Sequence, residues 1–261
     1  MVKAPASSLR GEAGASRNGG NDSMAPIFFH VVNWQAWSPE RPTAEAWRLW
    51  AGTGSDTGPG PADGSAPVPM LLRRRVGALG QQALRAAWSM PQSASARLVF
   101  ASRHGEFPRT LSIMDSLAAG EPVLPADFTL SVHHALAGLL SIARSNHHGH
   151  TAIAAGRDSF GCGLLEAAAC LAEKPDEPVL FVYYDEQLPS PFSDFDEDGA
   201  PLAVALTLAA GGGSSIGLTL SARPADMPVS RTPAEDFLRF LLDRAPSAAS
   251  PGERHLWRWT R

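Results

Sequence analysis

Residues 151–167 read TAIAAGRDSFGCGLLEA, and this stretch decides the fold. Its first five residues, 151–155, are apolar or β-branched, which predicts a buried strand. A short turn follows, and Asp158 or Ser159 then begins a helix that extends to about Glu173. The helix positions that should face a core recur at helical spacing: Phe160, Leu164, Ala167 and Leu171.

Strands and helices alternate on both sides of this unit. The sequence pattern predicts further strands at 27–32, 97–101, 179–184, 202–209 and 216–221. It predicts helices at 71–90, 107–119, 128–143 and 234–243, and a short helix that carries Trp47 and Trp50 behind an N-cap at Thr43. Asp127 is the expected cap of the 128–143 helix. This order favours one α/β domain with a mixed, mainly parallel sheet and flanking helices.

Both ends of the chain differ in composition from the middle. Residues 1–23 are rich in Ala, Ser and Gly and contain no aromatic residue, so we expect a disordered leader and consider Met24 a candidate natural start. Residues 24–245 form the expected domain. We expect residues 246–261, a Pro/Ser/Ala-rich segment that ends in two tryptophans, to be a flexible tail.

Charge and cysteine content limit the classes of function. The 22 basic and 26 acidic residues give a net charge of −4, which argues against a nucleic-acid partner. No apolar run approaches the ~20 residues of a membrane span. Cys162 and Cys170 lie on one predicted helix, roughly 12 Å apart along its axis. That separation exceeds the ~7 Å limit for a disulfide, so we expect a reduced, cytoplasmic protein.

Three stretches carry a resemblance to a known family. They are SRHGE at 102–106, PADFTLSVHHA at 125–135 with GLLSIA at 138–143, and the 151–167 stretch quoted above. Together they resemble the β-ketoacyl-synthase-like N-terminal domain family. Within that family they are similar to the short chain-length-factor-type subunits of bacterial aryl polyene type II polyketide synthases.

This resemblance implies a thiolase-like fold equivalent to one half of a ketosynthase. In a complete ketosynthase, a cysteine at a helix N-terminus holds the acyl chain, because the helix end favours the thiolate. Here Asp158 and Ser159 occupy that degenerate nucleophile position, and Cys162 lies about one turn too deep. The two histidines of the second half are also missing, since only His255 follows. We therefore expect no catalytic residue, cofactor or metal.

The resemblance also implies partners. A full-length ketosynthase and an acyl carrier protein are expected, with a homodimer as the alternative when the chain is alone. Four residues are candidates for the interface or an acyl tunnel: His133, His134, Ile153 and Phe160. Arg73, Arg74 and Arg75 are candidates for docking the acidic carrier protein, because guanidinium groups bind carboxylates and phosphates.

Two other functions remain open. Ser159 could be the nucleophile of a serine acyl hydrolase or acyltransferase, because a strand, a sharp turn and a helix also define a nucleophile elbow. Arg157 replaces the first glycine of that motif, however, and an N-cap role is favoured. The chain could also be a scaffold that only binds carrier protein. A cluster of three histidines, His147, His148 and His150, could suggest a metal site. A polar loop is the favoured interpretation, because a metal needs three or four ligands that converge on a supported site.

Overall fold

The computed structural model describes residues 24–52, 60–61, 68–195 and 199–261. The expected leader lies outside the described residues, as does most of the loop before residue 68. The strands are β1 (Ile27–Trp37), β2 (Gly60–Pro61), β3 (Arg97–Ala101), β4 (His150–Ile153), β5 (Val179–Asp185), β6 (Leu202–Ala209), β7 (Ser214–Ala222), β8 (Ser247–Pro251) and β9 (His255–Thr260). The helices are α1 (Ala44–Trp50), α2 (Met70–Arg73), α3 (Ala78–Ser89), α4 (Phe107–Ala118), α5 (Pro125–Ser131), α6 (Ala135–Arg144), α7 (Ser159–Glu173) and α8 (Pro233–Asp243).

The strands form one mixed sheet in the order β4-β3-β5-β6-β1-β7-β9-β8, with β2 beside β1. Strand β3 runs parallel to β4 and β5, and β1 runs parallel to β2. The other five pairings in the described chain are antiparallel. A mixed sheet was expected, but its mainly parallel character was not correct. The larger parallel part is the β3–β4–β5 unit, where helices connect the strands.

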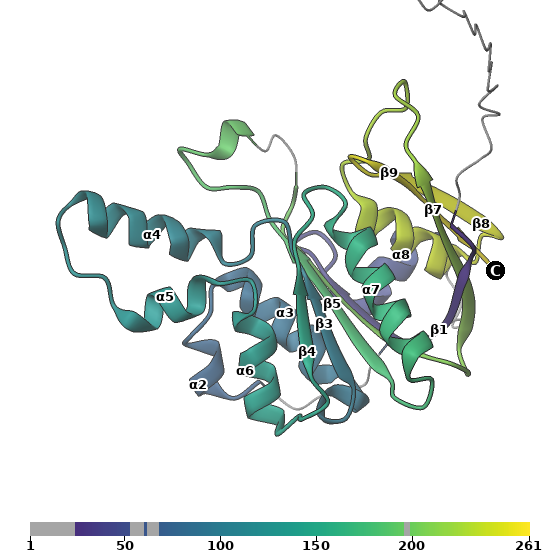
Figure 1. Cartoon of the computed structure of the whole chain (residues 1–261), viewed down its shortest axis with the longest axis horizontal. Coiled ribbons are helices and arrows are strands. Elements are labelled where there is room, and N and C mark those ends of the chain that lie inside the picture. Colours follow the sequence, from purple (N-terminus) through teal and green to yellow (C-terminus); the bar gives the residue numbers. More distant parts are fainter. Residues whose placement is uncertain (1–23, 53–59, 62–67, 196–198) are drawn as a thin grey trace, which may run out of the picture.

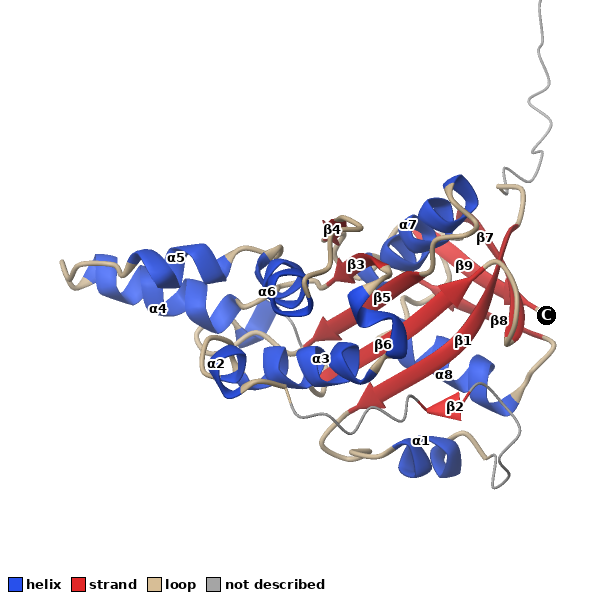
Figure 2. Ribbon diagram, turned by 90° about the horizontal axis from the view of Figure 1, so that it is seen from below, coloured by secondary structure: helices blue, strands red, loops and turns tan. Residues whose placement is uncertain are grey.

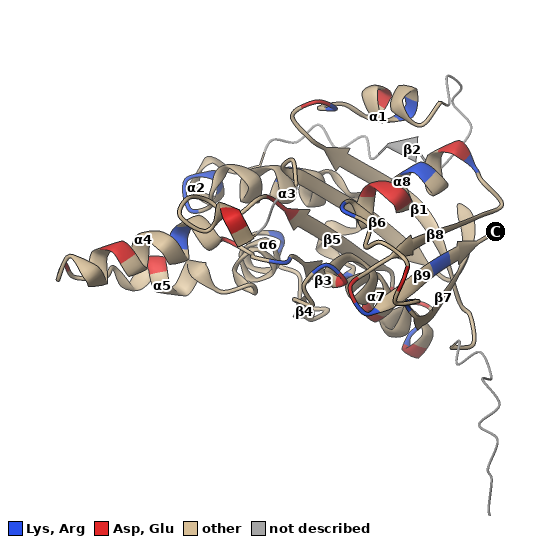
Figure 3. Cartoon of the chain, turned by 90° about the horizontal axis from the view of Figure 1, so that it is seen from above, with Lys and Arg blue, Asp and Glu red and all other residues tan. Residues whose placement is uncertain are grey.

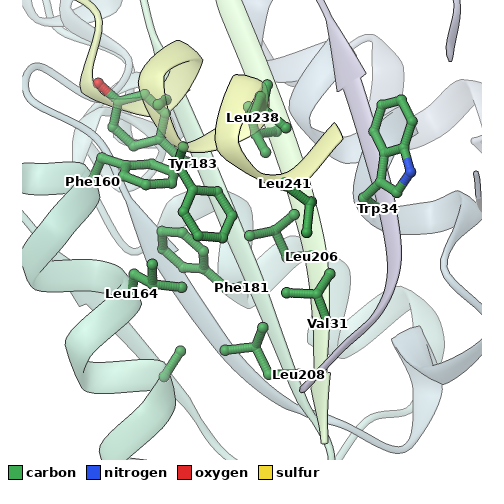
Figure 4. Close-up of a cluster of buried hydrophobic side chains, with 14 of the residues drawn as sticks. Val31, Trp34, Phe160, Leu164, Phe181, Tyr183, Leu206, Leu208, Leu238 and Leu241 are labelled. Atoms are coloured by element: carbon green, nitrogen blue, oxygen red, sulfur yellow. The ribbon is translucent and has the colours of Figure 1, made fainter. Parts of the chain in front are cut away.

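Helices cover both faces of the sheet (Figure 1). Side chains alternate along each strand, so one strand supplies two cores. In β5, Phe181 and Tyr183 join the core beneath α7 and α8, whereas Val182 and Tyr184 join the core beneath α3 and α6. Figure 4 shows part of the first core, where Phe160 of α7 packs edge-on against Phe181 and Tyr183.

The expected flexible tail is instead an ordered hairpin, so that prediction was wrong. Strand β9 pairs with β7 along Gly217–Ala222, and β8 pairs with β9. Trp257 and Trp259 are buried, and the Trp259 ring packs edge-on against Phe237 of α8. The Pro/Ser/Ala composition suggested disorder because the stabilising partners, β7 and α8, are not adjacent in the sequence. The domain therefore continues past residue 245.

Two predicted helices are each broken in two. The 71–90 helix divides into α2 and α3, and the amide of Gly77, just before α3, donates to Glu106 Oε2 at 2.7 Å. The 128–143 helix divides into α5 and α6 around residues 132–134. Asp127 does not cap a helix; its carboxylate pairs with Arg109. A tertiary contact thus overrides the helical periodicity at the first break.

Helices α4 and α5 form an arm that projects from the end of the sheet (Figures 1 and 2). The two helices pack on each other, and no residue of either is buried. Few charged residues lie on this arm (Figure 3). Several of its large apolar side chains face solvent: Met114, Leu117, Leu124 and Phe128.

Candidate functional site

The position predicted to be a degenerate nucleophile site, Asp158 and Ser159, lies where β4 leads into α7. Gly156 adopts a left-handed conformation, with φ of 57°, and lets the chain turn sharply into the helix. Asp158 precedes the first helical residue, and Ser159 is that residue. Both side chains are buried. The position expected from the sequence is therefore at the helix N-terminus.

The carboxylate of Asp158 holds the C-terminal hairpin in place. The Trp257 indole N–H donates to Asp158 Oδ1 at 2.8 Å, and the Arg254 amide donates to Oδ2 at 2.8 Å. A Cβ on Gly252 would lie only 1.8 Å from Oδ1, so the hairpin backbone approaches closely. Asp158 is therefore engaged in a structural contact between the start of α7 and the C-terminal hairpin, which sequence reasoning missed because its partners lie almost 100 positions away.

Ser159 uses its hydroxyl group to close the turn. The Ala155 amide donates to Ser159 Oγ at 2.9 Å, and Oγ donates to the Gly156 carbonyl at 2.7 Å. A serine nucleophile instead needs a base that accepts its proton. His255 lies beside Asp158, with Nδ1 3.8 Å from Oδ2. This geometry supports the structural role of Ser159 and gives no activated nucleophile.

The glycines around Cys162 permit close packing of α7. A Cβ on Gly161 would lie 2.2 Å from the Trp257 ring, and one on Gly163 would lie 2.6 Å from both Ala101 and Phe181. Cys162 is half-buried, and burial, followed by the nearby Asp158 charge, raises the pKa of its thiol. The thiol is therefore a poor nucleophile at neutral pH.

The four interface or tunnel candidates lie in different environments. Phe160 is fully buried in the core of this chain, so its assignment to an interface was wrong; intramolecular packing by α8 was not visible in the sequence. Ile153 is half-buried in β4, an edge strand of the sheet. His133 Nε2 lies 3.3 Å from the Arg103 carbonyl. His134 is exposed beside β4.

The His134 ring contacts His150, the first residue of β4. Nε2 of His134 faces Nδ1 of His150, and the ring centroids are 4.4 Å apart. Partial burial and His134 lower the pKa of His150.

In the loop between α6 and β4, the Asn146 side-chain amide donates to the carbonyls of Ser93 and Ala96 and so holds the loop in place. Among the described residues, no three His, Cys, Asp or Glu side chains could hold a metal ion.

The three consecutive arginines are exposed at the end of α2. Arg73 is the last residue of that short helix and the other two follow it, so the three arginines do not begin the long helix expected from the sequence. The carbonyl of Arg75 accepts a hydrogen bond from Arg109 of the α4–α5 arm at 2.8 Å. The arginine cluster therefore lies beside the base of the arm.

Comparison with solved structures places this geometry in a known fold. One match is the structure described as a ketosynthase (ApeO) in complex with its chain length factor (ApeC) from Xenorhabdus doucetiae. It has 27% identity and a TM-score of 0.76, and the alignment covers 90% of this chain and 100% of that chain. The ishigamide ketosynthase/chain length factor has 15% identity and a TM-score of 0.55, over 78% of this chain and 69% of that chain.

A β-ketoacyl synthase from Burkholderia phymatum STM815 also matches, with 14% identity and a TM-score of 0.56, over 85% of this chain and 71% of that chain. No curated protein matches the sequence.

The fold is the thiolase-like fold of ketosynthases, as expected. Residues 34–260 match the family described as "Beta-ketoacyl synthase, N-terminal domain", and the chain belongs to that family. Every helix in the described parts of the chain is too short or too polar to cross a bilayer.

Proposed function

We propose that this chain is a chain-length-factor-like subunit, without condensing activity of its own, that pairs with a full-length β-ketoacyl synthase. The pathway would make a polyketide such as an aryl polyene pigment, or a fatty-acid-like product. The similar structure from Xenorhabdus doucetiae, described as a ketosynthase with its chain length factor, supports such a pairing. The engagement of Asp158 and Ser159 in structural hydrogen bonds supports the lack of catalysis.

The exposed apolar surface of the α4–α5 arm carries this proposal. Leu117, Leu124 and Phe128 are each more than 60% exposed. Exposure of such large apolar side chains is unfavourable, because their burial away from water stabilises a protein or a complex. The edge strand β4 also offers unpaired backbone groups for a neighbouring strand. Apolar patches of this kind mark interfaces, and obligate interfaces commonly bury over ~2,000 Å². A ketosynthase that covers the arm and the β4 edge would bury both features.

The arm can be tested with one matched pair of variants. Phe128→Asp places a charge on the arm, and Leu49→Asp places one on α1, where Leu49 is equally exposed. We expect Phe128→Asp to weaken binding to a full-length partner ketosynthase by at least ~10-fold, because a buried unpaired charge costs about 1.4 kcal/mol or more. Leu49→Asp should bind like the wild type. The affinities are measured by biolayer interferometry with the purified ketosynthase.

Equal affinities of the two variants for the ketosynthase would show that the arm is not part of the interface. A wild-type chain that does not bind the ketosynthase at all would contradict the proposed function itself. The melting temperature of each variant serves as the folding control, since both substitutions are at exposed positions.

A second candidate, a scaffold that only binds carrier protein, is favoured by the exposed cluster of Arg73, Arg74 and Arg75. Three adjacent guanidinium groups suit an acidic surface or a phosphate. Reversing all three charges to Glu should abolish carrier-protein binding in this case. Binding of carrier protein without any ketosynthase partner would favour the scaffold over the subunit.

A further inference from the structure

The segment around α2 carries an exposed surface in which apolar and basic side chains are neighbours. Val68, Leu72 and Val76 recur every four residues and are buried in the core beneath α3 and α6. These anchors fix which side of the segment faces inward. Between them, two large apolar and three basic side chains are exposed: Met70, Leu71, Arg73, Arg74 and Arg75. We call these five residues the α2 patch.

The exposure of the apolar pair favours a surface that covers it. Met70 is 57% exposed and Leu71 is 68% exposed, and burial of such side chains away from water stabilises a complex. In a helical turn, residues three and four positions apart share a face, so Met70 is on the same face as Arg73 and Arg74. Leu71 shares a face with Arg74 in the same way. A surface that covers the apolar pair therefore also meets guanidinium groups.

The charge of this segment stays positive after its acidic neighbours are counted. Residues 53–76 contain the three arginines against two aspartates, Asp56 and Asp63, which lie outside the described residues, and no other charged residue. On the adjacent arm, Asp127 pairs with Arg109.

The two other carboxyl groups near the segment, Glu106 and Glu186, line a cleft together with Gly77. Burial raises the pKa of both, which disfavours their charged forms. The complementary surface is therefore anionic.

The size of the patch favours a lipid surface over a protein partner. A stable protein interface takes about 20–30 residues from each side, and the α2 patch offers five. A bilayer needs no matching shape, because apolar side chains enter its headgroup region and basic side chains bind its phosphates. Helix α2 lies at the periphery of the molecule, beside the base of the arm, where a flat surface can reach it (Figures 1 and 3).

We propose that the α2 patch binds the surface of a bilayer that contains anionic lipids. Met70 and Leu71 enter the headgroup region, and the three arginines bind lipid phosphates, since guanidinium groups match the geometry of phosphate. Two apolar side chains and three basic ones give less than stable anchoring needs, so the binding is reversible. This inference does not depend on the proposed function, and it gives the arginines a partner other than a carrier protein.

Co-sedimentation of the full chain with lipid vesicles tests the proposal. Vesicles of phosphatidylcholine alone are compared with vesicles of equal parts phosphatidylcholine and phosphatidylglycerol. We expect the chain to bind the anionic vesicles at least ~10-fold more tightly, because each arginine near an anionic surface contributes roughly fivefold. Added salt should weaken the binding, since it screens exposed charges.

Two multiple variants separate the parts of the patch. Met70→Ser combined with Leu71→Ser removes the apolar pair and keeps the charge. Arg73→Gln, Arg74→Gln and Arg75→Gln together remove the charge and keep the apolar pair. Each variant should weaken binding to the anionic vesicles by at least ~10-fold, because insertion and charge both contribute to interfacial binding.

Leu49→Ser and Arg258→Gln are the matched controls. Leu49 of α1 is 65% exposed, and Arg258 of β9 is exposed; α1 and β9 lie away from α2 (Figures 1 and 2). Both controls should bind the anionic vesicles like the wild type. The melting temperature of every variant checks that it folds.

Three outcomes would overturn the proposal. The first is a wild-type chain that binds neutral and anionic vesicles equally, or binds neither. The second is wild-type affinity in both α2 variants together with loss of binding in Phe128→Asp, which would assign lipid binding to the arm. The third is a chain that ignores vesicles but binds an acyl carrier protein through the three arginines, which would make the α2 patch a protein-binding site.

Discussion

At the scale of single residues, Asp158 joins two distant segments of the chain through its buried carboxylate. Its carboxylate accepts hydrogen bonds from Trp257 and from the Arg254 amide, and both donors are in the C-terminal hairpin. We predict that Asp158→Ala lowers the free energy of unfolding by about 2–3 kcal/mol, because the buried indole N–H loses its acceptor. Urea denaturation measures the change. Asp115→Ala, at an exposed position of α4, should change stability by less than about 0.5 kcal/mol.

Cys162 gives a second prediction at this scale. Burial and the Asp158 charge raise the pKa of its thiol, so the thiolate is scarce at neutral pH. We expect iodoacetamide and cerulenin to leave the folded chain without a stoichiometric adduct, as judged by intact mass spectrometry. Complete alkylation in urea is the control that the thiol can react. Rapid modification of the native protein at neutral pH would contradict the assignment of Cys162 as structural.

At the scale of elements, the β8–β9 hairpin should be part of the folding unit. Trp259 is fully buried against Phe237 and Phe240 of α8, whereas Arg258, its neighbour in β9, is exposed. Trp259→Ala should therefore cost about 3–5 kcal/mol, the usual range for a large buried side chain. Arg258→Ala should be nearly neutral. Thermal melting followed by circular dichroism compares them, and equal melting temperatures would show that the hairpin does not contribute to the core.

At the scale of the whole molecule, the β4 edge should contribute to assembly. We predict a stable heterodimer with the full-length ketosynthase, or a homodimer through the same surface when the partner is absent. Ile153→Asp should weaken either assembly by at least ~10-fold, because an unpaired charge would enter the contact. Leu220→Asp, at a half-buried position of β7 that packs on the same core, is the matched control.

Size-exclusion chromatography with light scattering measures the molar mass of both variants, with and without the ketosynthase. If Ile153→Asp and Leu220→Asp lose stability equally but only Ile153→Asp loses association, β4 is at the interface. A wild-type chain that stays monomeric and ignores the ketosynthase would refute the prediction.

Sequence patterns alone were enough to predict the local elements of the β3–α7–β5 region and the family. The 151–167 stretch predicted a strand, a turn and a helix, and β4 and α7 occupy those positions. Thr43 caps α1 as expected, accepting from the Ala46 amide at 3.2 Å. These features depend on periodicity and on caps that act within a few residues, which is why they are visible in one dimension.

The helix breaks, the hairpin and the partners of Asp158 became visible only in the folded chain. The Gly77 amide meets Glu106, and Asp158 meets Trp257, across 29 and 99 positions of sequence. No local pattern encodes such contacts. The same reason placed Phe160 in the core rather than at an interface, because α8 covers it from a distant part of the chain. Long-range packing selected among conformations that the local sequence allowed.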